Sequence, residues 1–570
     1  MKRRLMVLAL ACLAFQAVLG CSQERIELKV HDQAVNHVDD KLFGHFLERA
    51  SWGEPGYDAA RVGDSGRLDP RVVAILADWD VPLIRWPGGG DIRRIDWRDM
   101  IDNVPGREGP RPLFDISPKH PPLSNLFGVD EFLTLCDQLG AEPLLPVNFG
   151  AALSKEMPLE EAARLAAGLV AYCNSPVGAD LPEGMVDWPA IRKKNGRAEP
   201  YRVRYFQIGN EIWIYARETF EKIGLGAEAA DNQARARWYL KCFNAFADAM
   251  KAVDPHIELI TELNHTGDRL GPEMNRLVLM DPSMQKADWF VRHSYAPWAI
   301  KRISDDGREV DPRSLDDEQI WNAWVSLPRI DPESGLADFG WSDELRGLGR
   351  RVAVTEWNWN GWWGLGRENR PDFDSDLAKG VGAAGWLHAM MRLGDVIGMG
   401  CQSMTVGSSW GITGIRVDPS GKVAPYPLPT GQVTGLYSRY HGNVRLRTTT
   451  ANVPHFAQPF QMAGIAPAEK VLALDIVATS GPEAIYLHVI NRSFSRDLEV
   501  QVDLSDFEDV AGPAVLHSLT GRLENQPGPG QDLPVASVDD TLVEFSGGEL
   551  TVRFPKRSVS VLEIPRRAAE

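Results

Sequence analysis

Short apolar runs alternate with amphipathic segments from about residue 42 to residue 430. Runs such as residues 81–86 (VPLIRW) have the length and composition of buried strands. Between such runs, residues 129–140, 159–173 and 234–253 place apolar side chains at helical spacing, and residues 377–393 form another helical segment. Near-continuous apolar strands separated by helices indicate a parallel sheet that is covered by helices.

Eight strand segments precede residue 430 when KLFGHFLE is taken as the first. They lie at residues 41–48, 81–86, 142–150, 203–211, 257–263, 288–295, 351–357 and 399–406. Eight strand–helix units over nearly 400 residues predict an α/β fold, a (β/α)8 barrel with long loops. A doubly wound open sheet is the alternative, but no GxGxxG follows a first strand.

The pattern changes after about residue 435. Short strands such as AIYLHVIN, LEVQVDL and VSVLEI follow one another between Gly, Pro and Asp-rich turns, without a helical period. This predicts a C-terminal antiparallel β-sandwich, jelly-roll-like, that RIELKV (residues 25–30) also joins. The expected division is therefore 1–20, a signal peptide; 21–40, a strand segment of the sandwich; 41–434, the barrel; and 435–570, the sandwich.

The net charge and the cysteine positions bear on nucleic-acid binding, zinc binding and disulfide formation. The 570 residues carry a formal charge of −17 without a Lys/Arg cluster, which excludes nucleic acid as an expected partner. Cys136, Cys173, Cys242 and Cys401 are widely spaced in apolar contexts, without the spacing of zinc ligands. We expect buried free thiols; a disulfide is the alternative in an exported protein.

The N-terminal residues predict export. Lys2, Arg3 and Arg4 precede an apolar run from Leu5 to Leu19, which is short for a membrane span but suits a signal sequence. The run ends in VLGC, which resembles the lipobox of bacterial lipoproteins, so Cys21 is the expected lipidated residue. The protein is then anchored by lipid in the bacterial cell envelope, facing the periplasm or the cell surface. An ordinary secretory signal is the alternative.

Polar side chains finish several of the barrel strands, where the reacting groups of such barrels lie. They are Asn148, Asn210, Glu211, His293, Tyr295, Glu356 and Gln402. Glu211 and Glu356 end the fourth and the seventh strand. Two carboxyl groups that face one cavity suit glycosidic bond cleavage, in which one stays protonated and the other ionised. The structural alternative is a pair of ordinary salt bridges.

GNE and TEW after apolar strands resemble the clan A retaining glycoside hydrolases. FGHFLE, RWPGGG, DEFLTLCDQLGAEPLLPVNFG, RKKNGRAEPYRVRYFQIGNE and KAVDPHIELI, in this order, resemble family 51, the α-L-arabinofuranosidases. The resemblance implies that Glu211 is the general acid/base, Glu356 the nucleophile and Asn210 the donor to the sugar 2-hydroxyl. It further implies that Glu48, Tyr295 and Gln402 hold the sugar at the point of cleavage. Arg85 matches an arginine that orients the carboxylates.

Three further strand-end residues are expected to line the substrate site. His293 either orients the carboxylates or makes a structural hydrogen bond, and Asn148 ends the third strand. Trp357 belongs to the run WNWNGWWG, whose indole rings suit stacking on sugar faces, with packing under a loop as the alternative. The chain departs from the family at Gly90, where a polar residue that touches the sugar is usual.

We therefore expect an exo-acting, retaining α-L-arabinofuranosidase that acts on an oligo- or polysaccharide, with its carboxyl groups about 5–5.5 Å apart. Neither a metal nor a cofactor is expected. A clan A glycosidase for another furanoside, a xyloside or a β-glucan is one alternative, and a non-catalytic glycan-binding lipoprotein is the other. The family resemblance leaves a homo-oligomer open.

Overall fold

The computed structural model describes most of the chain in ranges separated by gaps. These are residues 25–49, 54–115, 122–226, 231–262, 272–295, 299–300, 302–327, 329–330, 337–338, 347, 349–360, 362–363, 375–462, 465–523, 536–545 and 548–567. The signal segment and Cys21 therefore lie outside the described residues. Among the described residues, no helix combines the length and the apolar character that crossing a bilayer requires.

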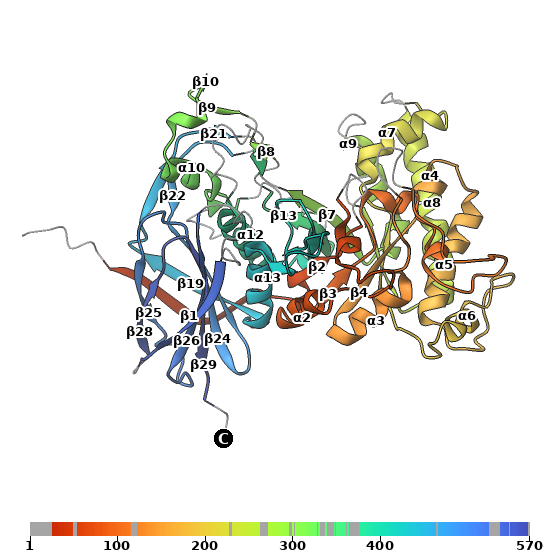
Figure 1. The fold of residues 1–570 in the computed structure, drawn as a ribbon. Coiled ribbons are helices and arrows are strands. Elements are labelled where there is room, and N and C mark those ends of the chain that lie inside the picture. Colours follow the sequence, from red (N-terminus) through yellow and green to blue (C-terminus); the bar gives the residue numbers. More distant parts are fainter. Residues whose placement is uncertain are drawn as a thin grey trace, which may run out of the picture.

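Eight parallel strands close into a barrel, which confirms the predicted fold class (Figure 1). In chain order they are β2 (Gly44–Phe46), β3 (Leu83–Arg85), β4 (Glu142–Val147), β5 (Tyr205–Ile208), β6 (Glu258–Glu262), β7 (Trp289–Tyr295), β13 (Val352–Asn358) and β15 (Ile397–Gln402). Every predicted strand segment overlaps one of them, although β13 ends one residue later and β15 begins two residues earlier than predicted. Their inward side chains form a closed core, which includes Phe46, Leu83, Tyr205, Trp289 and Met399.

Helices surround the barrel and form a second, larger core with the outer faces of the strands. They are α2 (Pro70–Asp78), α3 (Val129–Leu139), α4 (Gly150–Leu153), α5 (Leu159–Asn174), α6 (Trp188–Lys194), α7 (Ile212–Lys222), α8 (Asn232–Val253), α9 (Pro272–Leu279), α10 (Asp317–Trp324), α12 (Asp376–Arg392) and α13 (Pro429–Arg439). Local sequence explains their ends. The N–H of Gly128 donates to the Glu131 side chain at the start of α3, and Gly140 ends this helix with a φ of 71°.

The C-terminal region is largely β and lies at the left of Figure 1, coloured blue. Its nine-stranded sheet runs in the order β27 (Ala536–Val543), β26 (Ala514–Gly521), β29 (Ser558–Pro565), β24 (Ala484–Asn491), β23 (Leu474–Ser480), β19 (Val444–Ala451), β1 (Ile26–His37), β25 (Leu498–Asp503) and β28 (Glu549–Phe554). The N-terminal strand β1 thus lies within this sheet, antiparallel to β19 and parallel to β25.

The remaining described strands form small sheets of two or three strands. They are β8 (Ala299–Ile300) with β14 (Trp362–Trp363); β9 (Ile303–Asp305), β10 (Arg308–Glu309) and β21 (Gln461–Met462); β11 (Arg329–Ile330) with β12 (Ala337–Asp338); β16 (Val406–Gly407), β17 (Ile415–Arg416) and β18 (Tyr426–Pro427); and β20 (His455–Gln458) with β22 (Ala468–Leu472). All four cysteines that follow residue 100 are buried free thiols, as expected.

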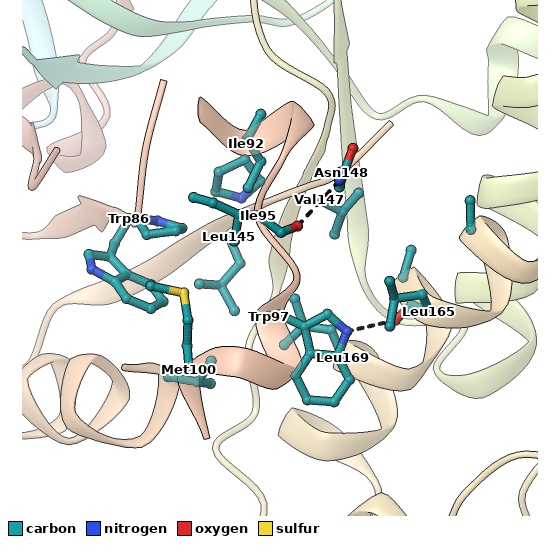
Figure 2. A pocket seen from close by; sticks show the side chains of 15 residues that line it. Trp86, Ile92, Ile95, Trp97, Met100, Leu145, Val147, Asn148, Leu165 and Leu169 are labelled. Carbon is teal, nitrogen blue, oxygen red and sulfur yellow. Dashed lines mark hydrogen bonds between the residues drawn. The ribbon is translucent and has the colours of Figure 1, made fainter. Parts of the chain in front are cut away.

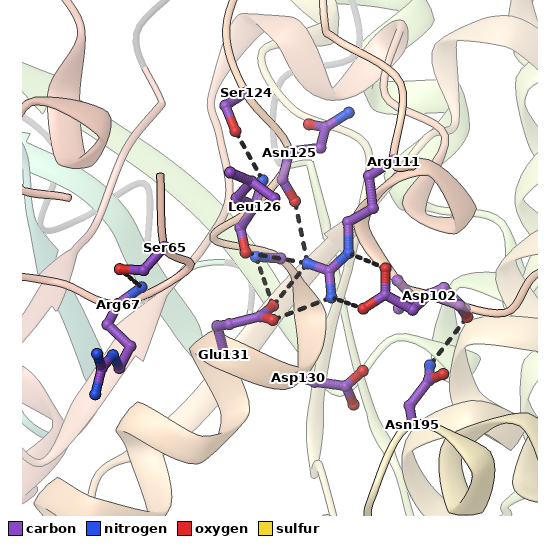
Figure 3. Close-up of polar contacts among 12 residues, drawn as sticks. Ser65, Arg67, Asp102, Arg111, Ser124, Asn125, Leu126, Asp130, Glu131 and Asn195 are labelled. Carbon is purple, nitrogen blue, oxygen red and sulfur yellow. Dashed lines mark hydrogen bonds and ion pairs between the residues drawn. The ribbon is translucent and has the colours of Figure 1, made fainter. Parts of the chain in front are cut away.

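A long connection between β3 and α3 is held by Arg111. Figure 3 shows its guanidinium group between the carboxylates of Asp102 and Glu131, with Nη2 to Asp102 Oδ2 at 2.9 Å and Nη1 to Glu131 Oε2 at 2.8 Å. The same connection supplies Asn125, whose Oδ1 accepts from the buried Arg49 at 2.6 Å. Because Arg49 directly follows Glu48, this network fixes the segment that leaves the first barrel strand.

The barrel and the β region are joined by a buried ionic cluster around Asp475 of β23. Its Oδ2 accepts from Arg492 at 3.0 Å, its Oδ1 accepts from Arg392 of α12 at 2.5 Å, and His388 Nδ1 lies 3.1 Å from Oδ1. Burial alone would raise the pKa of Asp475, but Arg392 and His388 lower it below its ordinary value. The cluster therefore couples the two parts of the molecule.

We expect Asp475→Ala to lower the free energy of unfolding by about 3–5 kcal/mol, because it removes a buried carboxylate that bonds two buried arginines, Arg392 and Arg492. Thermal and denaturant unfolding measure this loss. The exposed Asp539→Ala serves as the control, with an expected change within about 0.5 kcal/mol. Since the folded-state pKa is depressed, this stabilisation is present above the ordinary value of 3.8 and is lost as the pH falls through the folded-state pKa. A loss no larger than that of the control would contradict the assignment.

Candidate active site

Glu356 reaches the barrel interior because strand β13 contains a bulge. Ala353 pairs with Val291 of β7, but Glu356 pairs with His293, so β13 has one more residue than β7 between the two pairs. Side chains of a regular strand alternate between faces, and an inward Ala353 would turn residue 356 outward. The extra residue restores an inward direction and places Glu356 beside His293.

Three groups hold the Glu356 carboxylate, which is only 5% exposed. Arg85 Nη1 donates to Oε1 at 2.8 Å, Tyr295 donates its hydroxyl to Oε2 at 2.9 Å, and His293 Nδ1 lies 3.5 Å from Oε2. Burial raises the pKa of Glu356, but His293, Arg85 and Tyr295 oppose it, and the pKa ends below its ordinary value. Glu356 is therefore ionised at neutral pH.

Glu211 follows β5 in an abrupt turn into helix α7. Gly209 has a φ of 82°, and Glu211 itself has a φ of 46°, in the left-handed region that non-glycine residues seldom adopt. Glu211 is the N-cap residue of α7, and its backbone N–H donates to Glu262 Oε1 at 3.0 Å. This geometry turns a strand-end carboxyl group back over the barrel mouth.

His293 joins the two carboxyl groups. Its Nδ1 lies 3.0 Å from Glu211 Oε1, and its Nε2 bonds the Thr355 hydroxyl at 3.0 Å. One oxygen of Glu211, one oxygen of Glu356 and a ring nitrogen of His293 all lie within 4.8 Å of one another. Two glutamates that are far apart in the sequence thus face one site. They differ in surroundings, because the Glu211 side chain is 20% exposed and that of Glu356 is 6% exposed.

Arg85 also fixes the amide of Asn210. Its Nη2 donates to Asn210 Oδ1, so the Asn210 oxygen is occupied and Nδ2 is turned away as a donor. A Cβ atom built on Gly89 would lie 3.7 Å from this Nδ2 and 3.2 Å from Glu356 Oε1. Asn210 therefore presents an N–H group beside the ionised carboxylate.

Glu48 is a third carboxyl group in the site, 7% exposed, and its Oε1 lies 2.8 Å from the same Cβ position on Gly89. Burial raises the pKa of Glu48 well above its ordinary value, and ionised Glu356 raises it further against the opposing charge of Arg85. These surroundings favour the protonated form of Glu48, which can offer an O–H donor.

Glu211, His293 and Glu356 also have the spacing of metal ligands. Both oxygens of Glu356 already accept hydrogen bonds, from Arg85 and Tyr295, and a divalent cation would sit close to the Arg85 guanidinium. The arrangement therefore suits proton transfer and nucleophilic attack better than cation binding.

Known proteins with a similar sequence or fold include arabinofuranosidases. The family described as "Alpha-L-arabinofuranosidase 1 domain" matches residues 75–299. A protein named "Probable alpha-L-arabinofuranosidase C" from Aspergillus terreus is 24% identical over 566 residues, which cover 95% of this chain and 97% of that protein. The chain is an arabinofuranosidase-like glycoside hydrolase.

Solved structures share the fold of this arabinofuranosidase-like protein. An α-L-arabinofuranosidase from Thermotoga maritima, solved as an arabinose complex, matches with a TM-score of 0.66 and 21% identity, over 95% of this chain and all of that one. The GH51 arabinofuranosidase from Xanthomonas axonopodis pv. citri matches with a TM-score of 0.65 and 19% identity, again over 95% and 100%.

Two expectations for the arabinofuranosidase-like site are wrong. Gln402 faces helix α13, where Nε2 donates to the Thr430 hydroxyl at 2.9 Å and Oε1 accepts from Thr434 at 2.9 Å. Its neighbour Cys401 takes the inward position on β15. Trp357 is fully buried in the outer core, since it follows the inward Glu356 and points to the opposite face.

Three further tryptophans belong to the run WNWNGWWG, and the structure describes the side chain of one of them. Trp359 is also fully buried and packs against Trp324, with 5.2 Å between ring centroids. The side chains of Trp362 and Trp363 lie outside the described residues. The described indoles of this run are therefore core residues.

Asn148 braces a loop. Its Nδ2 donates to the Ile95 carbonyl at 3.3 Å and its Oδ1 accepts from Ala151 N at 3.1 Å. Figure 2 shows the first of these bonds at the edge of a pocket whose lining is almost wholly apolar, with Trp86, Ile92 and Leu145 among its residues. Both amide atoms are engaged in local structure, and no described contact links Asn148 to the carboxylates. Its expected role in substrate binding stays a prediction.

Two groups that shape the site were missed from the sequence. Glu262 ends β6, fully buried, and Glu54 accepts the N–H groups of Ser408, Ser409 and Trp410 at 2.6, 2.8 and 3.1 Å. Trp410 packs with Met404 and Ile412, and Tyr295, which bonds Glu356, packs against this cluster. The sequence does contain a signal for Glu262, since it is an acidic residue at the end of an apolar strand. Glu54 had none.

Gly89 and Gly90 offer a matched test of the packing. We expect Gly89→Ala to lower kcat/KM by about 10²-fold, because its Cβ would meet Glu48 Oε1 and a Glu356 carboxylate that cannot move away from Arg85 and Tyr295. Gly90→Ala meets no described atom within 4 Å, and we expect less than about a 5-fold change. Kinetics on an aryl arabinofuranoside measure both. Equal losses would contradict the packing argument.

Proposed function

We propose that this arabinofuranosidase-like glycoside hydrolase is an exo-acting, retaining α-L-arabinofuranosidase whose substrate is an oligo- or polysaccharide. The placement of Glu211 and Glu356 carries the proposal, because their nearest oxygens lie within 4.8 Å of each other. Retaining glycosidases have carboxyl groups about 5–5.5 Å apart, whereas inverting enzymes need about 6.5–9.5 Å to admit a water molecule.

In the first step, Glu356 attacks the anomeric carbon while Glu211 transfers its proton to the departing oxygen. The glycosidic bond breaks, and an ester forms between Glu356 and the sugar. In the second step, Glu211 removes a proton from water, and the resulting oxygen attacks the same carbon, which frees Glu356. Two inversions leave the sugar with its original configuration.

The surrounding groups suit these roles. Arg85 and Tyr295 keep Glu356 ionised and fix the direction of its attack. The Nδ2 group of Asn210 is oriented to donate to the sugar 2-hydroxyl, a bond that strengthens in the transition state. Neutral Glu48 can donate its proton to another hydroxyl without adding negative charge beside the nucleophile.

Product stereochemistry tests the mechanism. Proton NMR during hydrolysis of an aryl α-L-arabinofuranoside should show the α-anomer of arabinose first, and methanol should yield methyl α-L-arabinofuranoside. First appearance of the β-anomer would contradict a retaining mechanism. On an arabinose-bearing polymer, exo-action should release arabinose alone, whereas shortened backbone fragments would indicate endo-action.

A second candidate is a clan A glycosidase for a different sugar. The open space beside Gly90 favours it, because the residue that usually touches the sugar is missing there. A panel of aryl furanosides and pyranosides decides between the two. Turnover of a xyloside or a glucoside without turnover of an arabinofuranoside would favour the second candidate, and turnover of none would favour a non-catalytic glycan-binding lipoprotein.

We also propose that the protein is exported and lipid-anchored through Cys21 in the bacterial cell envelope, on the strength of the basic residues, apolar run and VLGC sequence. We expect Cys21→Ser to move the protein from the detergent phase to the aqueous phase in a Triton X-114 partition of expressing cells. The matched control is Cys12→Ser, which keeps the lipobox and should stay in the detergent phase. Aqueous partition of the unmodified protein would contradict the anchor.

A further inference from the structure

Glu262 is a buried acid that the proposed reaction does not use. It is the last residue of β6, next to β5 in the barrel, and its side chain is fully buried. Among the described residues, the hydrogen bond of its carboxyl group comes from the Glu211 backbone N–H, which donates to Oε1 at 3.0 Å. A carboxyl group thus lies directly behind the proposed general acid/base.

The Glu211 backbone needs such a partner. With a φ of 46°, Glu211 adopts a conformation that L-residues avoid because Cβ approaches the backbone. As the N-cap of α7, it has no partner within the helix for its N–H group. A buried N–H group without an acceptor is unfavourable, so Glu262 stabilises the turn that aims the Glu211 side chain.

We propose that Glu262 is a positioning residue for the general acid/base: its carboxyl oxygen holds the N–H group of Glu211 and thereby fixes the direction of the Glu211 carboxyl group. This inference rests on the proposed function. It assigns Glu262 a role in protonating the leaving group, through Glu211, without contact with the substrate.

The charge state of Glu262 follows from its surroundings. Burial is the largest cause of a pKa of Glu262 that lies well above the ordinary value. Glu211 and Glu356 face Glu262 from the site and raise this pKa further, whereas Arg85 lowers it. Tyr215 of α7 and Tyr239 of α8 lie on its other sides and are uncharged at neutral pH, because burial raises the pKa of each hydroxyl. These surroundings favour the protonated form of Glu262, whose carbonyl oxygen accepts the Glu211 N–H, a role that a glutamine amide can copy.

Two variants separate positioning from general stability. Glu262→Gln keeps an oxygen acceptor, whereas Glu262→Met keeps the length of the side chain and removes the acceptor. For each we compare kcat/KM on a dinitrophenyl arabinofuranoside, whose leaving group needs no proton, with kcat/KM on an alkyl arabinofuranoside, whose leaving group does. Thermal unfolding shows that each variant is folded.

We expect Glu262→Met to lose about 10²-fold on the alkyl glycoside and less than about 5-fold on the dinitrophenyl glycoside, because general acid catalysis contributes about 10²–10⁴-fold. Glu262→Gln should stay within about 3-fold of the unmodified protein on both, with the alkaline limb of its pH profile unmoved. An ionised Glu262 would instead give a glutamine variant whose alkaline limb moves to lower pH.

Equal losses of kcat/KM on both substrates in the folded methionine variant would overturn the inference. A loss of kcat/KM of about 10²-fold in the glutamine variant, on the alkyl glycoside alone, would also overturn it. If the methionine variant does not fold, the glutamine variant still decides through its substrate ratio and pH profile. Absence of turnover by the unmodified protein on either glycoside would count against the proposed function and not against the positioning contact.

Discussion

Replacing Glu356 with glutamine is expected to lower kcat/KM for an aryl α-L-arabinofuranoside by about 10⁴- to 10⁶-fold, the range for removal of a nucleophile that forms a covalent intermediate. Glutamine keeps the shape of the side chain, its amide oxygen can still accept from Arg85, and its amide N–H group can donate to the Tyr295 oxygen. It cannot attack the anomeric carbon as a carboxylate can. Initial rates from purified protein, with the unmodified chain as reference, measure the loss.

The exposed Glu469→Gln, on strand β22 of the C-terminal region, is the control and should keep full activity. Unchanged thermal unfolding of the Glu356 variant would show that the loss is chemical. If Glu356→Gln kept more than about one hundredth of the activity, Glu356 would not be the nucleophile.

The same group sets the acidic limb of the pH profile. Glu356 must be ionised to attack, and its pKa lies below the ordinary value of 4.5, because His293, Arg85 and Tyr295 outweigh the effect of burial. Activity should therefore fall only below about pH 4.5, as Glu356 takes up a proton. An acidic limb well above that value would contradict the electrostatics of the site.

Glu211→Ala is expected to have the second largest effect. For an alkyl arabinofuranoside kcat/KM should fall by about 10³- to 10⁴-fold, because the leaving oxygen departs without a proton. For a dinitrophenyl arabinofuranoside the fall in kcat/KM should be far smaller, since this leaving group departs as an anion. The ratio between the two substrates is the measurement.

Azide supplies a further check on Glu211. Without the general base, the glycosyl–enzyme ester reacts slowly with water, but azide attacks without base catalysis and should raise kcat on the dinitrophenyl substrate. The product should be the α-L-arabinofuranosyl azide, which keeps the configuration of the substrate. A β-configured azide, or equal losses on both substrates, would show that Glu211 does not act as the acid/base.

Strong periodic signals were sufficient for most of the fold. The segment 129–140 became α3, Val129–Leu139, and the apolar face of residues 234–253 is buried in α8. Short strands were predicted in the right places, but several of them are shorter than predicted. The run VPLIRW yields only the three-residue strand β3, because pairing with β2 and β4 extends over Leu83–Arg85 alone. Ladder length depends on neighbouring strands, which local sequence does not specify.

The direction of individual side chains was less predictable. Gln402 ends β15 as expected and Trp357 is the last residue but one of β13, yet both side chains face the helix layer. One residue of register decides which face a strand residue meets, and the bulge in β13 shifts that register immediately before Glu356. Nothing in VAVTEW marks an extra residue.

The sequence by itself determined the order of strands and helices, the barrel, the β-rich C-terminal region and the two glutamates that finish the fourth and seventh strands. These follow from hydrophobic periodicity and family resemblance, which are carried by residues near one another in the chain. Only the tertiary structure decided that His293 bridges those glutamates, that Arg85 orients Asn210, and that Glu262 holds the backbone of Glu211. These contacts join residues from different strands, so barrel closure and strand register, rather than local sequence, place them within bonding distance.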